Sequence, residues 1–205
     1  MSSDPCTKTT PLKVKRQEQI KNAAIEVFSA KGFHNTTMQA IARAAGLGKG
    51  TLYWYWKSKE ELAFSIVSDM LSDFLSLIEE TENTRGPVLK RLQVLAGKVA
   101  DHYQGRKASC RLLLKFRAER HYTFRKDYIE KIMSYYAKMR TSLSEIIQDG
   151  IDSGELTRID PQALALIFLG IVQGLEIEWL ENEETFSLHE GLSTVLRVME
   201  PGLKT

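Results

Sequence analysis

The sequence of 205 residues is poor in the groups from which most metal and redox sites are built. It has two cysteines, Cys6 and Cys110, and four histidines, none of which stands in a zinc-ligand pattern such as H-E-x-x-H or C-x-x-C. So few thiols without a metal-ligand spacing are typical of proteins from a reducing cytosol. We therefore expect no metal, no cofactor and a cytoplasmic location.

Several longer patterns are missing as well. No segment alternates apolar and polar residues with a period of two, so we expect an all-α protein. There is no phosphate-binding G-x-x-x-x-G-K-[ST], and the glycines at 46, 48 and 50 follow no strand, which excludes a dinucleotide fingerprint. Residues 1–10 lack the apolar region of a signal peptide, and the most apolar run, 163–175, is too short to span a bilayer.

A catalytic pair of acidic residues is not evident either. Glu176 and Glu178 are two positions apart on an expected helix, so their side chains point to different faces. We therefore do not expect an enzyme, and an all-α enzyme remains only a remote alternative.

The charge that is present is unevenly distributed. Residues 1–60 carry ten Lys or Arg and four Asp or Glu, a net charge of +6. Residues 61–205 carry eighteen basic and twenty-two acidic residues, a net charge of −4. A basic module joined to a mildly acidic one indicates that only the first meets a polyanion.

The stretch from Thr36 to Leu62 reads TTMQAIARAAGLGKGTLYWYWKSKEEL. We expect Thr36 to cap a first short helix, with Gln39 three residues on as its capping-box partner. Gly46 then follows this helix at a position where a left-handed conformation favours glycine. Two short helices joined by a glycine turn are typical of a helix-turn-helix, whose second helix enters the major groove of DNA.

The second helix is expected to open at Gly48 and to present basic, hydroxyl and phenolic groups on its outer face. Ser58 and Glu61 form a second capping box, and Lys59 lies in the first turn of the helix that they start. A cation there is unfavourable unless an anion such as a DNA phosphate binds. The alternative is an ordinary helical corner with solvated polar residues. The expected DNA-contacting residues are Thr36, Thr37, Lys49, Gly50, Thr51, Tyr53, Trp54, Tyr55 and Lys59.

The pattern T-T-x-x-x-I-A-x-x-A-G-x-x-x-G-T-L-Y-x-Y-[FW]-x-S-K-E-x-L is present from Thr36 to Leu62. It resembles the tetracycline-repressor (TetR) family of bacterial transcription regulators, closely over residues 15–62 and in helical layout beyond. Trp54 and Trp56 depart from the more usual aromatic residues of that pattern. The resemblance implies a homodimeric regulator, most often a repressor, that binds a palindromic double-stranded operator and is released by a small effector.

Three regions are expected along the chain. Residues 1–11 form a disordered arm, residues 12–57 the three-helix DNA-binding domain, and residues 58–205 a helical domain for effector binding and dimerisation. Besides the two short helices of the helix-turn-helix, the expected helices are 13–31, 58–80, 88–103, 109–118, 124–149, 161–181 and 188–199. A connection is expected at 119–123, and Pro201 is expected to stop the last helix.

The expected helix 161–181 is apolar nearly all round, although it lies near the chain end. Such a helix must be buried on more than one side, which indicates a second subunit. The alternative is a central core helix in a monomer. The resemblance adds that the last two helices pair with their mates. The expected interface residues are Leu166, Leu169, Gly170, Gln173, Gly174, Ile177, Leu192, Leu196 and Met199.

The helices between 88 and 149 combine apolar bulk with sparse polar groups, a composition shared by ligand pockets and ordinary cores. The resemblance implies a small effector here, which we expect to be substantially apolar. The rival hypothesis is a regulator of the same fold that a protein partner controls without any small molecule. The expected effector-binding residues are Phe74, Leu92, His102, Tyr103, Cys110, Leu114, Phe116, Tyr135, Met139 and Gln173.

Overall fold

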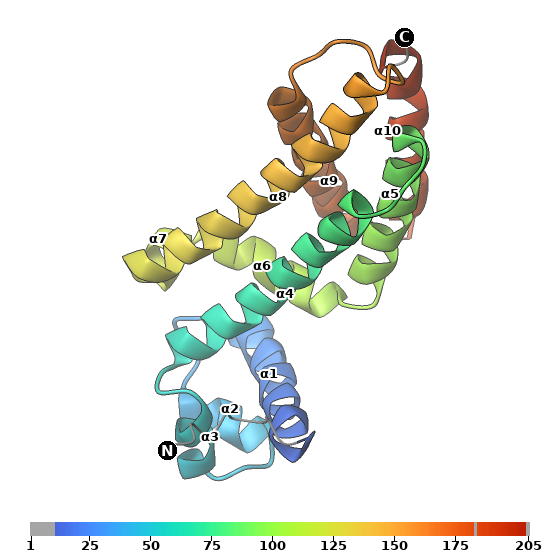
Figure 1. The fold of residues 1–205 in the computed structure, drawn as a ribbon. Helices are drawn as coiled ribbons and strands as arrows, with labels where there is room; N and C mark the ends of the chain where they lie inside the picture. Colours follow the sequence, from blue (N-terminus) through green and yellow to red (C-terminus); the bar gives the residue numbers. More distant parts are fainter. Residues whose placement is uncertain (1–10, 183, 204–205) are drawn as a thin grey trace, which may run out of the picture. The chain divides into compact units, whose positions relative to one another are not determined.

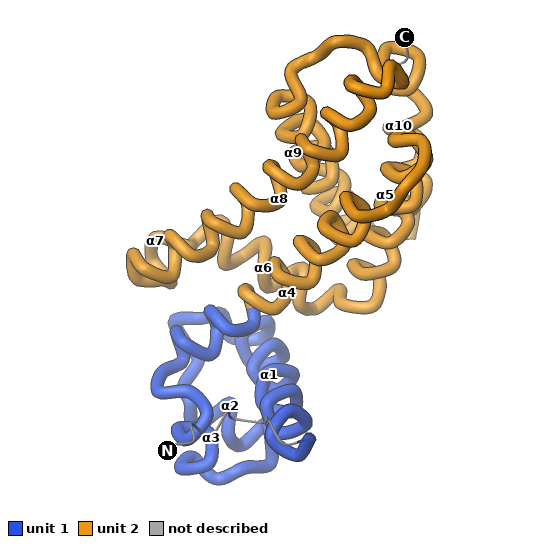
Figure 2. Tube along the Cα trace, in the orientation of Figure 1, with its two compact units in different colours: residues 1–66 blue, residues 67–205 orange. Residues whose placement is uncertain are grey.

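A computed structural model describes residues 11–182 and 184–203 of the chain. Ten α-helices and no β-strand occur within these ranges, which confirms the all-α prediction (Figure 1). The chain divides into two compact units, residues 1–66 and 67–205 (Figure 2). Helix α4, Lys59–Glu82, contributes its first two turns to unit 1 and the remainder to unit 2. The expected arm at 1–11, with Cys6, lies outside the described residues except for Pro11, which begins the first helix.

Unit 1 consists of α1, Pro11–Lys31, α2, Met38–Ala44, α3, Lys49–Tyr55, and the start of α4. These helices enclose one small apolar core, because each places its apolar stripe inward. The largest of its fully buried side chains are Ile20, Phe28, Ile41, Leu52 and Leu62.

The turn between α2 and α3 depends on Gly46. Its φ of 65° lies in the left-handed region that favours glycine, as the sequence predicts. The Leu47 amide donates back to the Ala42 carbonyl at 2.8 Å, which closes the end of α2. The tight closure sets the chain direction into α3, whose outer face carries the candidate DNA contacts.

Unit 2 contains the rest of α4 and six further helices. In it α8 packs along α9 and α10 packs along α5. The expected connection at 119–123 is largely a single helical turn, α7. The helices are α5, Val88–Gln104, α6, Lys107–Ala118, α7, Arg120–Thr123, α8, Lys126–Asp152, α9, Pro161–Glu181, and α10, Leu188–Leu203.

Two helices end at least three residues later than expected. Helix α8 continues through Gly150, where an added Cβ would lie 2.8 Å from the Leu156 side chain, so glycine permits close packing at this point. Helix α10 continues through Pro201 to Leu203. Leu203 is buried, and its carbonyl accepts from the Thr157 amide at 2.7 Å. These contacts hold the last turn although proline removes one helical hydrogen bond.

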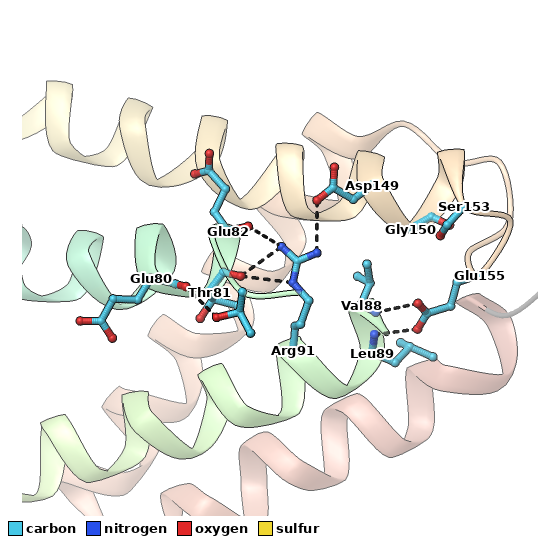
Figure 3. A network of polar contacts seen from close by, with 11 residues as sticks. Glu80, Thr81, Glu82, Val88, Leu89, Arg91, Asp149, Gly150, Ser153 and Glu155 are labelled. Carbon is cyan, nitrogen blue, oxygen red and sulfur yellow. Dashed lines mark hydrogen bonds and ion pairs between the residues drawn. The ribbon is translucent and has the colours of Figure 1, made fainter. Parts of the chain in front are cut away.

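Unit 2 is also cross-linked by buried Arg91 of α5 (Figure 3). Its guanidinium donates to the carbonyls of Thr81 and Glu82, the last residues of α4, at 2.9–3.2 Å. A third contact, at 3.2 Å, reaches the Asp149 carboxylate of α8. A cation at these carbonyls satisfies groups that a helix end leaves without partners.

The N-terminus of α5 is also held by Glu155 from the loop after α8 (Figure 3). Its two carboxylate oxygens accept from the amides of Val88 and Leu89 at 2.6 and 2.9 Å. An anion at a helix N-terminus is favoured by the orphan amides and by the helix dipole. The ends of α4 and α8 are therefore both fixed to α5.

Candidate DNA-binding surface and ligand cavity

Helix α3 separates an inner apolar side from an outer polar side. Leu52 is fully buried and Trp56, just after the helix, is 5% exposed. Lys49, Gly50 and Thr51 are exposed in the first turn, which leaves their polar groups free to meet a ligand. A seven-residue helix with this division fits the second helix of a helix-turn-helix.

Aromatic rings continue the outer side of α3. Trp54 is 65% exposed and Tyr53 is 37% exposed, whereas Tyr55 is half-buried and meets the Trp54 ring edge-on at 4.7 Å. The ammonium groups of Lys49 and Lys13 lie 5.6 Å from the Tyr53 ring and 5.5 Å from the Trp54 ring. Cations held above exposed rings present both charge and flat apolar surface to a polyanion.

The cap of α2 differs from the expectation. Thr37, not Thr36, is the N-cap, and its hydroxyl accepts from the Ala40 amide at 3.2 Å. Thr36 is 1% exposed, and its hydroxyl donates to the Gly32 carbonyl at 2.7 Å. The buried Thr36 hydroxyl therefore stabilises the turn after α1, whereas Thr37 is exposed and is the stronger candidate for a DNA contact.

Lys59 is the larger correction. Its ammonium donates to the carbonyls of Phe33, His34 and Thr36 at 2.8, 3.0 and 3.0 Å. It also lies 4.6 Å from the Phe33 ring, and burial lowers its pKa. An ammonium has three N–H donors, and all three are used within unit 1. The carbonyls explain the cation in the first turn of α4 without a phosphate.

The start of α4 has most of the expected capping box. The Ser58 hydroxyl accepts from the Glu61 amide at 3.0 Å. The Glu61 carboxylate reaches back to the amide of Lys57, one residue before the cap, at 2.7 Å. The corner between α3 and α4 is thus fixed by side chains whose pattern is visible in the sequence.

Unit 2 contains a cavity of about 350 Å³. This volume lies within the range of small-molecule sites, about 300–1,000 Å³. Helices α4, α6, α7, α8 and α9 contribute to its wall, and a loop residue completes it. The lining residues are Val67, Leu113, Phe116, Arg117, Arg120, Phe124, Ile132, Met133, Tyr136, Ala137, Arg140, Leu166, Leu169, Gly170 and Gln173.

Three guanidinium groups, from Arg117, Arg120 and Arg140, stand among these mainly apolar residues. Arg117 donates to the Gln173 amide oxygen, and its guanidinium lies 5.5 Å from the Tyr136 ring. Arg120 is bonded to the Arg117 carbonyl at 3.0 Å. None of the three was among the expected effector-binding residues. Arg120 lies in the single helical turn α7, where a connection was expected.

A second chamber, of about 20 Å³, shares Leu113, Arg117, Tyr136 and Gln173 with the larger cavity. Glu176 of α9 lines it and is 2% exposed. Burial raises the Glu176 pKa to about 7, although Arg117 and the hydroxyl of Tyr103 partly oppose the shift. Sequence reasoning considered Glu176 only as half of an acid pair. A single carboxylate within an apolar helix is the signal that could have found it.

The expected effector residues separate into groups. Phe116 and Gln173 line the larger cavity, and Gln173 also lines the chamber together with Phe74, Tyr103 and Leu114. Buried Cys110 contacts the Tyr103 carbonyl through its sulfur at 3.9 Å. Cys110 lines neither cavity, and the same is true of His102, Tyr135, fully buried Met139, and Leu92, which faces a groove under α10.

The expected interface residues also separate. Leu169, Leu192 and Leu196 are buried within the chain itself, because α10 and α9 pack on their neighbours. Met199 and Gln173 are half-buried, whereas Gly170 and Gly174 face open space. Large apolar side chains remain exposed on the outer side of α9 and α10. They are Leu166, Ile167, Ile177 and Val198, of which Ile167 and Val198 were not expected.

Helix α9 is long and apolar enough to cross a membrane by length and composition alone, since it extends beyond the apolar run seen in the sequence. It is the one such helix among the described residues. Leu164, Ala165 and Phe168 are buried within unit 2, and the same helix carries buried Glu176. The core helix of a soluble protein has the same features.

Comparison with known proteins gives a consistent result. Residues 20–66 match the profile of bacterial regulatory proteins of the tetR family. The fatty acid metabolism regulator protein of Bacillus subtilis is 24% identical over 191 residues, covering 90% of this chain and 94% of that protein.

Solved structures share the fold. FadR from Bacillus subtilis, in complex with stearoyl-CoA, has a TM-score of 0.75 at 23% identity and covers 90% of this chain and 98% of its own. SmeT, the repressor of the Stenotrophomonas maltophilia multidrug efflux pump SmeDEF, has in its triclosan complex a TM-score of 0.78 at 19% identity, with coverages of 93% and 92%. The helix-turn-helix, the helical second unit and these likenesses agree, and the region from residue 20 to residue 66 belongs to the tetR family of bacterial regulatory proteins.

Proposed function

We propose that this protein is a cytoplasmic transcription regulator, acting as a repressor, that binds a palindromic operator as a homodimer and is released by a small effector. The exposed outer side of α3 carries the proposal. Lys49 and Thr51 lie in its first turn, where a recognition helix contacts base edges. Tyr53, Trp54 and Thr37 extend the surface toward the DNA backbone. The family members are regulators, so we infer a binding protein rather than an enzyme.

The homodimer is inferred from the outer side of α9 and α10. Leu166, Ile177 and Val198 are 59%, 42% and 70% exposed, and Gly170 and Gly174 leave room for a neighbouring helix. Apolar residues and small residues on adjoining helices are suited to an isologous interface. Two copies also supply the two recognition helices that a palindrome requires.

The effector is inferred from the composition of the larger cavity. Its apolar wall suits a hydrocarbon or aromatic body, and Arg117, Arg120 and Arg140 suit an anionic group. We therefore propose an amphipathic anion in place of a wholly apolar molecule. FadR binds stearoyl-CoA, which combines an acyl chain with phosphates, and this agrees with the proposed class. The rival hypothesis of a protein partner predicts no ligand in this cavity.

The proposed route to the DNA runs through α4. Val67, the first residue of unit 2 along this helix, lines the larger cavity, and the same helix begins in unit 1 at Lys59. A ligand that displaces Val67 shifts α4 and changes the spacing of the two recognition helices. The effect on DNA affinity can be no larger than the ligand's preference for the shifted conformation, which is typically about 1–3 kcal/mol.

Selection of duplex DNA from a random pool tests the proposal. We expect a two-fold symmetric site, with half-sites about one helical turn apart or slightly more. With that site, Thr51→Val should change base preference at one symmetric position, and Lys49→Ala should weaken binding. Lys138→Ala removes an exposed lysine of α8 and serves as the charge-matched control. A pool without enrichment, or equal losses for Lys49→Ala and Lys138→Ala, contradicts the proposed surface.

A further inference from the structure

Glu176 is a buried carboxylate with an unused hydrogen-bonding atom. Its side chain lies on α9 and is 2% exposed. The Tyr103 hydroxyl lies close enough to lower the pKa of the Glu176 carboxyl, and Oε1 has no hydrogen-bond partner among the described residues. A buried acceptor without a partner is rare, because the loss of its hydration destabilises the fold by about 1–3 kcal/mol or more for a charged group.

The space beside Glu176 has the size of one small polar group. The chamber measures about 20 Å³, and a water-sized group needs roughly 10–15 Å³ on such a measure. Phe74, Leu114 and Met70 provide most of its apolar wall. Four residues line both this chamber and the larger cavity, so a ligand in the larger cavity lies next to the chamber.

The surrounding groups restrict what can occupy the chamber. A carboxylate accepts hydrogen bonds and repels another anion, so an acidic group does not fit. Arg117 lines the same chamber and already supplies a positive charge, which disfavours a second cation. Among the described residues no group of three His, Cys, Asp or Glu could hold a metal ion. A neutral hydrogen-bond donor of hydroxyl size satisfies all three conditions.

We propose that Glu176 is a specificity-determining residue that accepts a hydrogen bond from a hydroxyl group of the effector, placed in this chamber while the ligand's apolar body fills the larger cavity. The inference rests on the proposed effector function of that cavity. Tyr103 of α5 lines the same chamber, and its hydroxyl favours the charged form of the carboxyl by lowering its pKa. Sites of this kind discriminate strongly, since a ligand without the donor leaves the buried acceptor unpaired.

Two isomeric probes isolate the hydroxyl group. Decan-1-ol and nonyl methyl ether have the same formula, but only the alcohol donates a hydrogen bond. Titration calorimetry with the full-length protein should show the alcohol binding at least about tenfold more tightly than the ether, because the bond is made to a buried charged or polar acceptor. Sodium decanoate, titrated in parallel, reports on the larger cavity and its arginines.

Variants assign the preference to the carboxylate. In Glu176→Leu the tenfold preference should disappear, and in the near-isosteric Glu176→Gln it should fall at least about threefold. Glu178→Leu on the same helix is the matched control and should keep the full preference, because the Glu178 carboxylate is exposed and, among the described residues, accepts a hydrogen bond from Asn182.

The outcomes distinguish failure of the Glu176 subsite from failure of the proposed effector cavity. If decanoate binds the wild type but the isomers bind equally, or neither binds, the Glu176 subsite is wrong and the effector cavity stands. A preference for the alcohol that persists in both Glu176 variants also overturns the assignment. If decanoate, alcohol and ether all fail to bind, the proposed effector cavity is rejected as well.

Discussion

Replacing Lys59 with alanine tests whether this lysine holds unit 1 together or holds DNA. The ammonium makes three hydrogen bonds of 2.8–3.0 Å to the carbonyls of Phe33, His34 and Thr36, and it lies over the Phe33 ring. Charged hydrogen bonds contribute about 1.5–3 kcal/mol each, and an exposed cation–π contact about 0.5–1 kcal/mol. Because the side chain is half-exposed, water replaces part of these contacts. We expect Lys59→Ala to destabilise unit 1 by about 2–4 kcal/mol.

Hydrogen exchange of peptides from α1 to α3 measures this directly. A loss of about 2–4 kcal/mol lowers their protection by about 30- to 700-fold, at about 1.4 kcal/mol for each factor of ten. Lys57→Ala removes an exposed lysine with a single long contact, of 3.4 Å, and should leave protection nearly unchanged. The slope of DNA affinity against salt should not change in Lys59→Ala. Normal protection together with a slope smaller by about one would refute the reasoning and restore a phosphate contact.

Three further predictions concern unit 2. Arg91→Met should lower the free energy of unfolding by about 2–4 kcal/mol in a denaturant titration, since it leaves the carbonyls ending α4 without their buried donor. Glu176→Gln should gain stability over the wild type as pH rises. The Glu176 pKa is about 7 in the folded state and 4.5 in the unfolded state, so the folded state keeps its proton to higher pH. The free energy of unfolding of the wild type therefore falls by about 3 kcal/mol as the pH rises from 4.5 to 7. Tyr103, Cys110, Arg117 and Tyr136 face the carboxyl, and thermal melts from pH 4.5 to 8 measure the difference. Val198→Glu should sediment as a folded monomer at micromolar concentration, whereas Lys138→Glu on α8 should remain dimeric.

Much of unit 1 could be predicted from the sequence because its signals are local. Gly46 has the left-handed conformation that its position after α2 predicts, and Ser58 caps α4 through Glu61. The local sequence does not decide whether Thr36 or Thr37 is the N-cap of α2. Both hydroxyls suit a cap, and only packing against the end of α1 shows that Thr36 is buried.

Lys59 could not be assigned from sequence for a similar reason. Its position in the first turn of a helix indicates an anionic partner, and the sequence offered DNA phosphate as that partner. The folded chain instead brings three carbonyls from 23 to 26 residues away. A contact between distant segments leaves no periodic signal.

In unit 2 the positions of the helices along the chain were predictable, but the packing of one helix against another was not. Asp160 and Pro161 are typical residues for the start of a helix, and the Asp160 carboxylate caps α9 at the expected position. Which apolar side faces its own chain depends on tertiary packing, so Leu192 and Leu196 were assigned to the interface although they are buried inside the subunit. The cavity residues Arg117 and Arg120 depended likewise on how α6 and α7 meet α8 and α9.

Reciprocal binding measurements test the central proposal, ligand control of DNA binding, most directly. The ligand is the small molecule that native mass spectrometry finds on protein purified from its own cells, and the DNA is the site selected from the random pool. Calorimetry with and without that DNA should show ligand affinity reduced by the same factor, about 5- to 150-fold, by which the ligand reduces DNA affinity. Equal ligand affinity in the presence and absence of DNA would contradict ligand control.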